Sequence, residues 1–201
     1  RILREARARG VPIDGEASPH HLCLTDDLVE GYDTSFKMNP PLRTRADVEE
    51  VKRGVADGTI RFLATDHAQH TLEEKEQSYL KAPSGGPLVQ HSLVALLELH
   101  HQGVFSLEKI VQKSAHNVAD LFAIEKRGFI REGYFADLVL VDLDSPWTVT
   151  RESLLSKCGW SPFEGQTFRS KVNTTWVNGN RVYDSGSVIE GSLGHRLTFN
   201  R

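Results

Sequence analysis

The sequence predicts an α/β chain in two parts, βα units of a barrel over residues 1–126 and a β-rich domain segment over residues 127–201. In the first part, short apolar stretches alternate with helical patterns, which is typical of parallel βα units. In the second part strand patterns dominate, and Asn178-Gly179 is a strong hairpin signal between "TTWV" and "RVY". No internal repeat or low-complexity linker lies between the two parts.

The helices and strands of the first part are expected in alternating order. They are a helix at 2–9 stopped by Gly10, a strand at 11–17, a helix at 44–58, a strand at 59–65, and helices at 87–102 and from 106 to about 122. Thr44, with Asp47 three residues on, and Ser106 are the expected N-caps of two of these helices. Gly58 is placed to end the helix that Thr44 begins.

The second part is expected to form strands over "GFIREGYFADLVLVDLD" and "KVNTTWVNGNRVYDSG". Large aromatic side chains bury much apolar area. We therefore expect Trp147, Trp160 and Trp176 to pack the β domain or its seam with the barrel.

Length, composition and charge limit the number of domains and the kinds of partner that we expect for this chain. A chain of 201 residues with 39% hydrophobic content suffices for one large or two small domains. The net charge of −3 gives no electrostatic reason to expect nucleic acid or an anionic membrane as partner. No stretch approaches the roughly 18 unbroken apolar residues of a membrane span. The sequence thus predicts a protein that binds neither.

The two cysteines and the first residues add two expectations. Cys23 and Cys158 lie far apart, so they offer neither a disulfide framework nor a thiolate zinc site, and a reducing cytoplasm fits. The opening "RILREARARG" has no Met and reads as the last turns of a helix. We therefore expect a C-terminal piece of a longer protein.

The apolar stretch "TIRFLA" breaks into a cluster of ionisable side chains, Asp66, His67 and His70. A surface loop, with Asp66 capping the next turn, is the simplest reading. In a βα barrel, however, the residues that end the strands at the C-terminal face are the ones that meet substrate. On that reading Asp66 sits where catalytic groups belong.

Several stretches together resemble the C-terminal half of a dihydroorotase of the amidohydrolase superfamily. In order they are "EASPHHLCLTDDL", "KMNPPLRTRADVEE", "DGTIRFLATDHAQHTLEEKE", "KAPSGGPLVQHSL", "GFIREGYFADLVLVDLDSPWTV" and "KCGWSPFEGQTF". The resemblance covers nearly the whole chain. It implies the C-terminal part of a TIM-like (β/α)8 metal-dependent hydrolase barrel, followed by part of a small β-sandwich domain.

The resemblance implies that Asp66 ends the eighth barrel strand, ligates one of two zinc ions and serves as general acid and base. A carboxylate can take a proton from attacking water and pass it to the departing nitrogen. In some relatives, the glutamate that matches Glu16 touches an additional metal. Glu16 is therefore a candidate metal ligand, but a weaker one than Asp66. No organic cofactor is implied.

Four further residues are implied to bind substrate. Asn39 matches an asparagine that hydrogen-bonds the substrate ring, although Asn before Pro-Pro is also a common loop opening. His70 matches the residue that holds the substrate carboxylate, but alone it reads as a surface histidine. Ser84 and Gly85 match a loop whose backbone N–H groups contact the ring, and a flexible linker is the alternative.

Other histidines are weaker candidates. His20 and His21 look like a metal pair, but adjacent residues of a strand point to opposite faces, so structural or ligand-orienting roles are expected. His100 and His101 are expected to be solvated. Gln69 replaces the proline that the family has between its two histidines, which frees the backbone beside His70.

The HxH motif, the bridging residue and the further histidines of the family's dinuclear site have no match in this chain. The resemblance therefore implies a dihydroorotase fragment that cyclises N-carbamoyl-L-aspartate to dihydroorotate, in either direction, only with its missing half. An allantoinase or hydantoinase, or an inactive dihydroorotase-like scaffold subunit, are the alternatives. The expected protein is cytoplasmic, and either a homo-oligomer or a partner of aspartate carbamoyltransferase.

Overall fold

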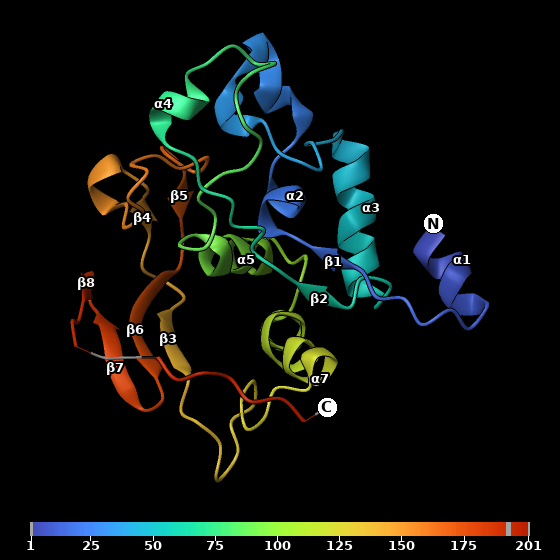
Figure 1. The fold of residues 1–201 in the computed structure, drawn as a ribbon, viewed down its shortest axis with the longest axis vertical. Helices are drawn as coiled ribbons and strands as arrows, with labels where there is room; N and C mark the ends of the chain where they lie inside the picture. The colour runs from blue at the N-terminus through green and yellow to red at the C-terminus, as the bar shows by residue number, and fades with distance from the viewer. Residues whose placement is uncertain (1, 192–193, 201) are drawn as a thin grey trace.

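A computed structural model describes residues 2–191 and 194–200 (Figure 1). In chain order the elements are α1 Ile2–Ala8, β1 Glu16–Ala17, α2 Pro19–Cys23, η1 Asp26–Tyr32, η2 Thr34–Phe36, α3 Arg45–Ala56, β2 Phe62–Leu63, α4 Leu72–Lys75, α5 Ser92–His101, α6 Leu107–Val111, η3 Gln112–His116, α7 Asn117–Phe122, β3 Leu138–Asp142, β4 Trp147–Thr148, η4 Arg151–Ser153, β5 Thr167–Phe168, β6 Lys171–Val177, β7 Asn180–Asp184 and β8 Ser187–Val188. Within the described residues, no helix is both long enough and apolar enough to span a bilayer.

Strands β1 and β2 form a parallel pair, as the alternating pattern predicted. Both are shorter than the predicted strands. The backbone before β1 turns back on itself, because the Ile13 N–H donates to the Val11 carbonyl at 2.9 Å. Beyond β2, the Ala64 N–H donates to the Ala17 carbonyl at 3.1 Å, which carries the pairing toward Asp66.

Two helices begin at the predicted caps. The Thr44 hydroxyl accepts the Asp47 N–H at 3.3 Å and begins α3, and the Ser106 hydroxyl accepts the Lys109 N–H at 3.2 Å and begins α6. The helix α3 ends at Ala56, and Gly58 follows with a φ of +87°. Both caps and the glycine stop are confirmed.

The long helix predicted from residue 106 contains a π-helical turn, η3, between α6 and α7. Two side chains of this region donate to carbonyls just before β2: Lys113 Nζ to Ile60 at 2.6 Å, and Asn117 Nδ2 to Arg61 at 2.6 Å. A π turn widens the helix by one residue, and such turns often mark positions with special contacts. Here the turn coincides with the attachment of the helix to the strand.

The helix α5 is the centre of the core. It begins at Ser92 rather than at 87, because the Ser92 hydroxyl donates to the Leu88 carbonyl at 2.8 Å in a preceding turn. One apolar cluster joins α5 to β1, β2, α2, α3 and α6, and comprises Ala17, Leu22, Val55, Ile60, Leu63, Leu96, Leu97, Leu99, Phe105 and Ile110. A second comprises Leu24, Met38, Leu42, Leu88, Val94, Ala95, Val149, Phe163 and Phe168. Most residues of α5 are therefore buried, whereas its polar side chains Glu98, His100 and His101 are only partly buried.

The β-rich part contains an antiparallel sheet in the order β3-β6-β7-β8 and a separate β4-β5 pair (Figure 1). The predicted hairpin is confirmed: Asn178 and Gly179 connect β6 to β7 with φ values of 53° and 80°. The second apolar cluster draws residues from both parts, for example Met38 and Phe168. The two parts therefore share a core.

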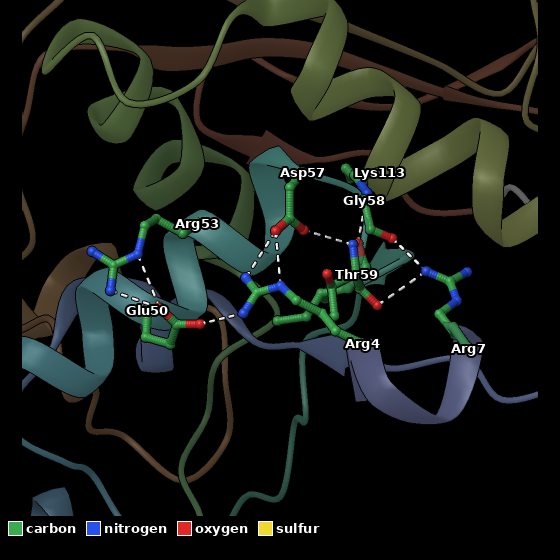
Figure 2. A network of polar contacts seen from close by, with 9 residues as sticks. Arg4, Arg7, Glu50, Arg53, Asp57, Gly58, Thr59 and Lys113 are labelled. Atoms are coloured by element: carbon green, nitrogen blue, oxygen red, sulfur yellow. Dashed lines mark hydrogen bonds and ion pairs between the residues drawn. The ribbon is translucent and has the colours of Figure 1, made fainter. Parts of the chain in front are cut away.

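A polar network fastens α1 to the end of α3 (Figure 2). Arg4 donates to Asp57 Oδ2 at 2.8 Å and also pairs with Glu50, while Arg7 donates to the Gly58 carbonyl at 2.6 Å. Asp57 in turn accepts the Thr59 N–H at 2.8 Å. These side chains are largely exposed, and exposed ion pairs contribute little stability each. Their effect is to orient α1.

One expectation about side chains is wrong, and another is confirmed. His100 and His101 are half-buried rather than solvated: His100 Nδ1 lies 3.0 Å from the Phe105 carbonyl, and His101 Nε2 lies 2.8 Å from Ser170 Oγ. Trp160 is buried, and its indole N–H donates to the His70 carbonyl at 2.8 Å. Trp160 thus packs where the β-rich part meets the first part, as predicted.

Candidate functional site

Asp66 lies three residues beyond β2, at the end where parallel βα proteins place their functional groups. Its φ of 50° is uncommon for a residue with a side chain, although Asp tolerates this region better than most. The carboxylate is 43% exposed, so it is open to a ligand. The strand and the turn after it therefore hold a carboxylate at the edge of the sheet.

His20 lies beside Asp66 because β1 and β2 are parallel and both residues follow the same end of the pair. His20 Nε2 is 4.0 Å from Asp66 Oδ2. The imidazole is fully buried, and neither ring nitrogen has a hydrogen-bond partner among the described residues. Burial, with His21 as a smaller cause, lowers the pKa of His20 to about 3. His20 is thus a neutral, unpartnered donor and acceptor next to the carboxylate.

The prediction that His20 and His21 lie on a strand is wrong. Both belong to the short helix α2, which Ser18 precedes and Pro19 opens, and proline is well suited to the first helical position. His20 is buried, while His21 Nε2 lies 2.8 Å from the Pro40 carbonyl. The signal for the helix was Ser-Pro before the two histidines, and it was missed.

The potential metal ligands of the described residues do not gather in one place. Within residues 2–191 and 194–200, no group of three or more His, Cys, Asp or Glu side chains is arranged to hold an ion. Glu16, the weaker candidate, lies in β1 opposite Phe62 and is exposed. A catalytic zinc normally has about three protein ligands and a water. The described residues thus offer a carboxylate with an imidazole 4.0 Å away, which is at most part of a metal site.

Asn39 lies in an extended loop after η2, next to the buried Met38, and its own side chain is exposed. The peptide bond between Asn39 and Pro40 is cis. The Pro40 carbonyl lies 2.8 Å from His21 Nε2, one residue from His20. The structure therefore links the Asn39 loop to the helix that carries His20.

The two histidines after Asp66 differ in their contacts. His67 Nδ1 accepts the Leu88 N–H at 3.0 Å and the Val89 N–H at 3.2 Å, so it fixes the chain before α5. His70 is partly exposed, and its Nδ1 lies 3.4 Å from Glu74 Oε2. His67 has a structural contact, whereas the His70 ring keeps an exposed edge.

Gly85 occupies a position that only glycine fits. Its φ is +121°, and an added Cβ would lie 2.6 Å from the Ala68 carbonyl oxygen. Its N–H donates to the Lys37 carbonyl at 2.9 Å, and its carbonyl accepts from Lys75 Nζ at 2.9 Å. The loop around Ser84 is therefore held against the segments of Ala68 and Lys37, and it is not a free linker.

The chain thus brings three of the predicted segments together, around Asn39, around Asp66 and His70, and around Ser84 and Gly85. A buried lysine among them, Lys75, was missed, because a lysine that ends a short surface-like helix gives no signal of burial. Two open hollows of about 640 and 420 Å³ lie elsewhere, along α6 and beside β3 and β6. They are distant in sequence from the Asp66 segment.

Parallel strands that end in a carboxylate, with loops and helices around that edge, define the chain as part of an α/β protein with a strand-end site. A family model described as "Amidohydrolase family" matches residues 1–182. The chain belongs to the amidohydrolase family. This family implies a metal cofactor. The described residues supply at most some of the ligands that such a metal would need.

Relatives named dihydroorotase match this chain over most of its length. The protein of Endomicrobium trichonymphae is 41% identical over 183 residues, which are 90% of this chain and 43% of the relative. That of Geobacter metallireducens is 44% identical over 183 residues, which are 91% of this chain and 43% of the relative. The chain thus spans less than half the length of these relatives.

Solved structures show the same fold. The L-hydantoinase (dihydropyrimidinase) of Arthrobacter aurescens superposes with a TM-score of 0.88 at 28% identity, over 94% of this chain and 43% of that chain. The dihydropyrimidinase of Brevibacillus agri superposes with a TM-score of 0.85 at 26% identity, over 93% of this chain and 42% of that chain. The backbone arrangement therefore matches the corresponding part of these two structures.

Proposed function

We propose that this chain is the C-terminal part of a dihydroorotase. Together with the rest of the enzyme, it would interconvert N-carbamoyl-L-aspartate and dihydroorotate. The observation that carries the proposal is the 41–44% identity to dihydroorotases over 183 residues, which includes Asp66 and its surroundings. Identity of that level over 90% of the chain favours a shared reaction more strongly than the 28% identity to the hydantoinase structure.

In this proposal β1 and β2 are the last two strands of a TIM-like barrel, and residues 127–201 are part of a β-sandwich domain. The parallel β1-β2 pair and the antiparallel sheet of the second part support this division. A barrel closes only when all of its strands are present. The remaining strands would come from the portion of the protein that this chain does not include.

We propose Asp66 as the general acid and base. In the hydrolytic direction, water attacks the ring amide carbon, and the Asp66 carboxylate accepts one of its protons. The C–N bond then breaks, and the proton passes from Asp66 to the departing nitrogen. The reverse direction releases water and closes the ring. The exposure and strand-end position of the Asp66 carboxylate support this role.

Substrate contacts are proposed for the other predicted residues. Asn39 would hydrogen-bond the ring, and His70 would donate to the substrate carboxylate from its exposed edge. For Ser84 and Gly85, the bonds that Gly85 already makes favour a supporting role for the glycine. The contact with the ring would then fall to Ser84.

We propose that Asp66 ligates one of two zinc ions in the complete enzyme, and that the other ligands come from outside this chain. Glu16 remains a weaker candidate. A bound zinc ion would lower the pKa of water and polarise the amide carbonyl. A cytoplasmic location, and assembly as a homo-oligomer or with aspartate carbamoyltransferase, are further parts of the proposal.

A hydantoinase-type activity is the second candidate, because the fold superposes on an L-hydantoinase with a TM-score of 0.88. The decisive experiment expresses the complete enzyme and compares hydrolysis of dihydroorotate with that of hydantoin and allantoin. We expect turnover of dihydroorotate only. Preferred hydrolysis of hydantoin would favour the second candidate, and absence of any turnover in zinc-loaded protein would favour an inactive scaffold.

Asp66→Asn is the matched variant for that experiment. The amide keeps the size of the side chain but cannot accept a proton at neutral pH, so turnover should fall by about a thousandfold or more. Zinc content should be measured on the same samples by atomic absorption. The 201-residue chain alone should hold no stoichiometric zinc and show no turnover, and both should appear when the complementary portion is co-expressed.

A further inference from the structure

Lys75, the last residue of α4, is a buried lysine. Its side chain is 1% exposed, which makes it one of the largest fully buried side chains in the described chain. A capping box begins α4: the Thr71 hydroxyl accepts the Glu74 N–H at 3.2 Å, and Glu74 Oε2 accepts the Thr71 N–H at 2.9 Å. This single helical turn fixes where Lys75 enters the protein.

The ammonium group of Lys75 donates to three main-chain carbonyls. Nζ lies 2.9 Å from the Gly85 oxygen, 3.0 Å from the Pro83 oxygen and 3.4 Å from the Lys37 oxygen. These three bonds use all of its donors. Nζ also lies 5.3 Å from the ring centre of Trp160, a distance at which a cation is attracted to the aromatic face. Within residues 2–191 and 194–200, no carboxylate forms an ion pair with Nζ. The Asp33 carboxylate acts on Lys75 from a longer distance and raises its pKa, but burial and Lys37 lower the pKa by more.

These partners belong to the three segments assigned to substrate. Lys37 lies two residues before Asn39, and Pro83 and Gly85 flank Ser84. Trp160 donates its indole N–H to the His70 carbonyl at 2.8 Å. Lys75 is therefore the point at which the Asn39, Ser84 and His70 segments meet.

The chain between α4 and α5 also binds a second ammonium group, that of Lys37, which follows η2. Lys37 Nζ donates to the carbonyls of Tyr79 and Ala82, each at 2.6 Å. The chain between α4 and α5 is thus wrapped around two cations that are satisfied by carbonyl oxygens. A buried charge without a counter-ion favours an anion nearby, because its field is poorly screened.

We propose that Lys75 is a positioning residue, which fixes the Asn39, His70 and Ser84 segments relative to one another and whose unpaired charge favours a carboxylate-bearing substrate over a neutral ring. This inference rests on the proposed function for the identity of the substrate. Burial, with Lys37 as a smaller cause, lowers the pKa of Lys75 to about 8, so the ammonium form still prevails at pH 7. The energetic cost of burying it is consistent with a functional use.

The test compares Lys75→Met, which removes charge and donors, with Lys75→Gln, which removes the charge but keeps an amide donor. Lys113→Met is the matched control: Lys113 is 3% exposed and donates to the Ile60 carbonyl at 2.6 Å, away from these segments. All variants are made in the complete enzyme. Hydrogen exchange of residues 37–39, 66–70 and 83–89 is measured together with KM and kcat for dihydroorotate.

We expect Lys75→Met to speed exchange in these three segments by at least tenfold and to raise KM for dihydroorotate by at least tenfold, with a smaller change in kcat. Lys75→Gln should retain most of the exchange protection and still raise KM by about fivefold. Lys113→Met should affect neither. Unchanged exchange in Lys75→Met would overturn the positioning role, and an unchanged KM in Lys75→Gln would overturn the role of the charge.

The two levels of inference fail differently. If wild-type enzyme does not turn over dihydroorotate, the proposed function fails, and the exchange measurement still decides the positioning role. The role of the Lys75 charge is then tested with whichever substrate the enzyme does turn over. If that substrate is a neutral ring, its KM should not rise in Lys75→Gln, and a rise would contradict the role of the charge. If the wild type turns over dihydroorotate and both Lys75 variants behave as Lys113→Met, only the inference about Lys75 fails.

Discussion

His20 faces Asp66 across the end of the parallel strand pair, with 4.0 Å between Nε2 and Oδ2 and no hydrogen bond to either ring nitrogen from the described residues. A buried polar group without a partner costs stability, so such a group is retained where it has another use. A small approach of the Asp66 carboxylate would make a hydrogen bond from Nε2. His20 is therefore placed to orient the Asp66 carboxylate when the carboxylate moves closer, while leaving it unbound at 4.0 Å.

His20→Leu should therefore lower activity without lowering stability. We expect the free energy of unfolding to stay within about 1 kcal/mol of wild type or to rise, because leucine leaves no unpaired nitrogen. The kcat for dihydroorotate should fall by about tenfold or more. Urea unfolding and steady-state kinetics on the complete enzyme measure both, and full activity with lower stability would show that His20 is only a core residue.

Asn39→Ala and His70→Ala should weaken substrate binding and leave zinc content unchanged. Both side chains are at least partly exposed. Neither belongs to a cluster of potential metal ligands among the described residues. We expect KM for dihydroorotate to rise by about tenfold in each, the scale of one lost charged or polar hydrogen bond. Metal analysis provides the control, because loss of zinc in either variant would mark that residue as part of the metal site.

Gly85→Ala should be far more damaging than alanine at another glycine of positive φ. A Cβ at Gly85 would lie 2.6 Å from the Ala68 oxygen, whereas nothing lies within 4 Å of a Cβ added to Gly159, which has a φ of +71°. Strained backbone alone costs on the order of 1–3 kcal/mol, and the overlap adds to it. In thermal unfolding, Gly159→Ala should lose only the stability that the backbone strain costs, and Gly85→Ala should lose clearly more because it also overlaps Ala68. Equal losses would contradict the close packing on Ala68.

Stability should fall on mild acidification because of His91. This ring is buried against Phe163 and Phe168, and burial lowers its pKa to about 4. An unfolded chain takes up the proton near pH 6.5, so it binds more protons than the native state between about pH 6.5 and 4, and stability rises with pH in that window. From pH 7 to pH 5 the loss from His91 should be about 2 kcal/mol.

His91→Phe tests this assignment by urea unfolding at pH 7 and pH 5. The variant should lose less stability than wild type between the two pH values. His20, whose pKa is lowered to about 3, contributes in the same direction and stays in place in both proteins. An unchanged pH dependence in His91→Phe would assign the acid sensitivity to other groups.

Local signals in the sequence predicted much of the backbone. Thr44 and Ser106 cap helices through their own hydroxyls, and Asn178 and Gly179 take the positive φ values that their turn requires, so the local sequence suffices to predict them. The parallel β1-β2 pair also followed from the alternating pattern. The caps and the turn each depend on a few consecutive residues, whereas the strand pair joins residues 16–17 to residues 62–63.

The contacts that depend on distant residues were not predictable in the same way. The burial of Lys75 depends on carbonyls at Lys37, Pro83 and Gly85, which no local pattern brings together. The π turn in the helix after Ser106 depends on its contacts with the strand. The site residues themselves were named through resemblance, and their roles stay predictions.

The position of α5 has a consequence for how this protein tolerates change. Val94 and Ala95 belong to one apolar cluster, while Leu96, Leu97 and Leu99 belong to the other. A mutation on either side of this helix therefore disturbs packing between residues 1–126 and residues 127–201. Over evolutionary time, the five α5 residues that belong to these clusters should accept fewer polar replacements than the exposed positions of α3, since each is packed tightly by its own cluster.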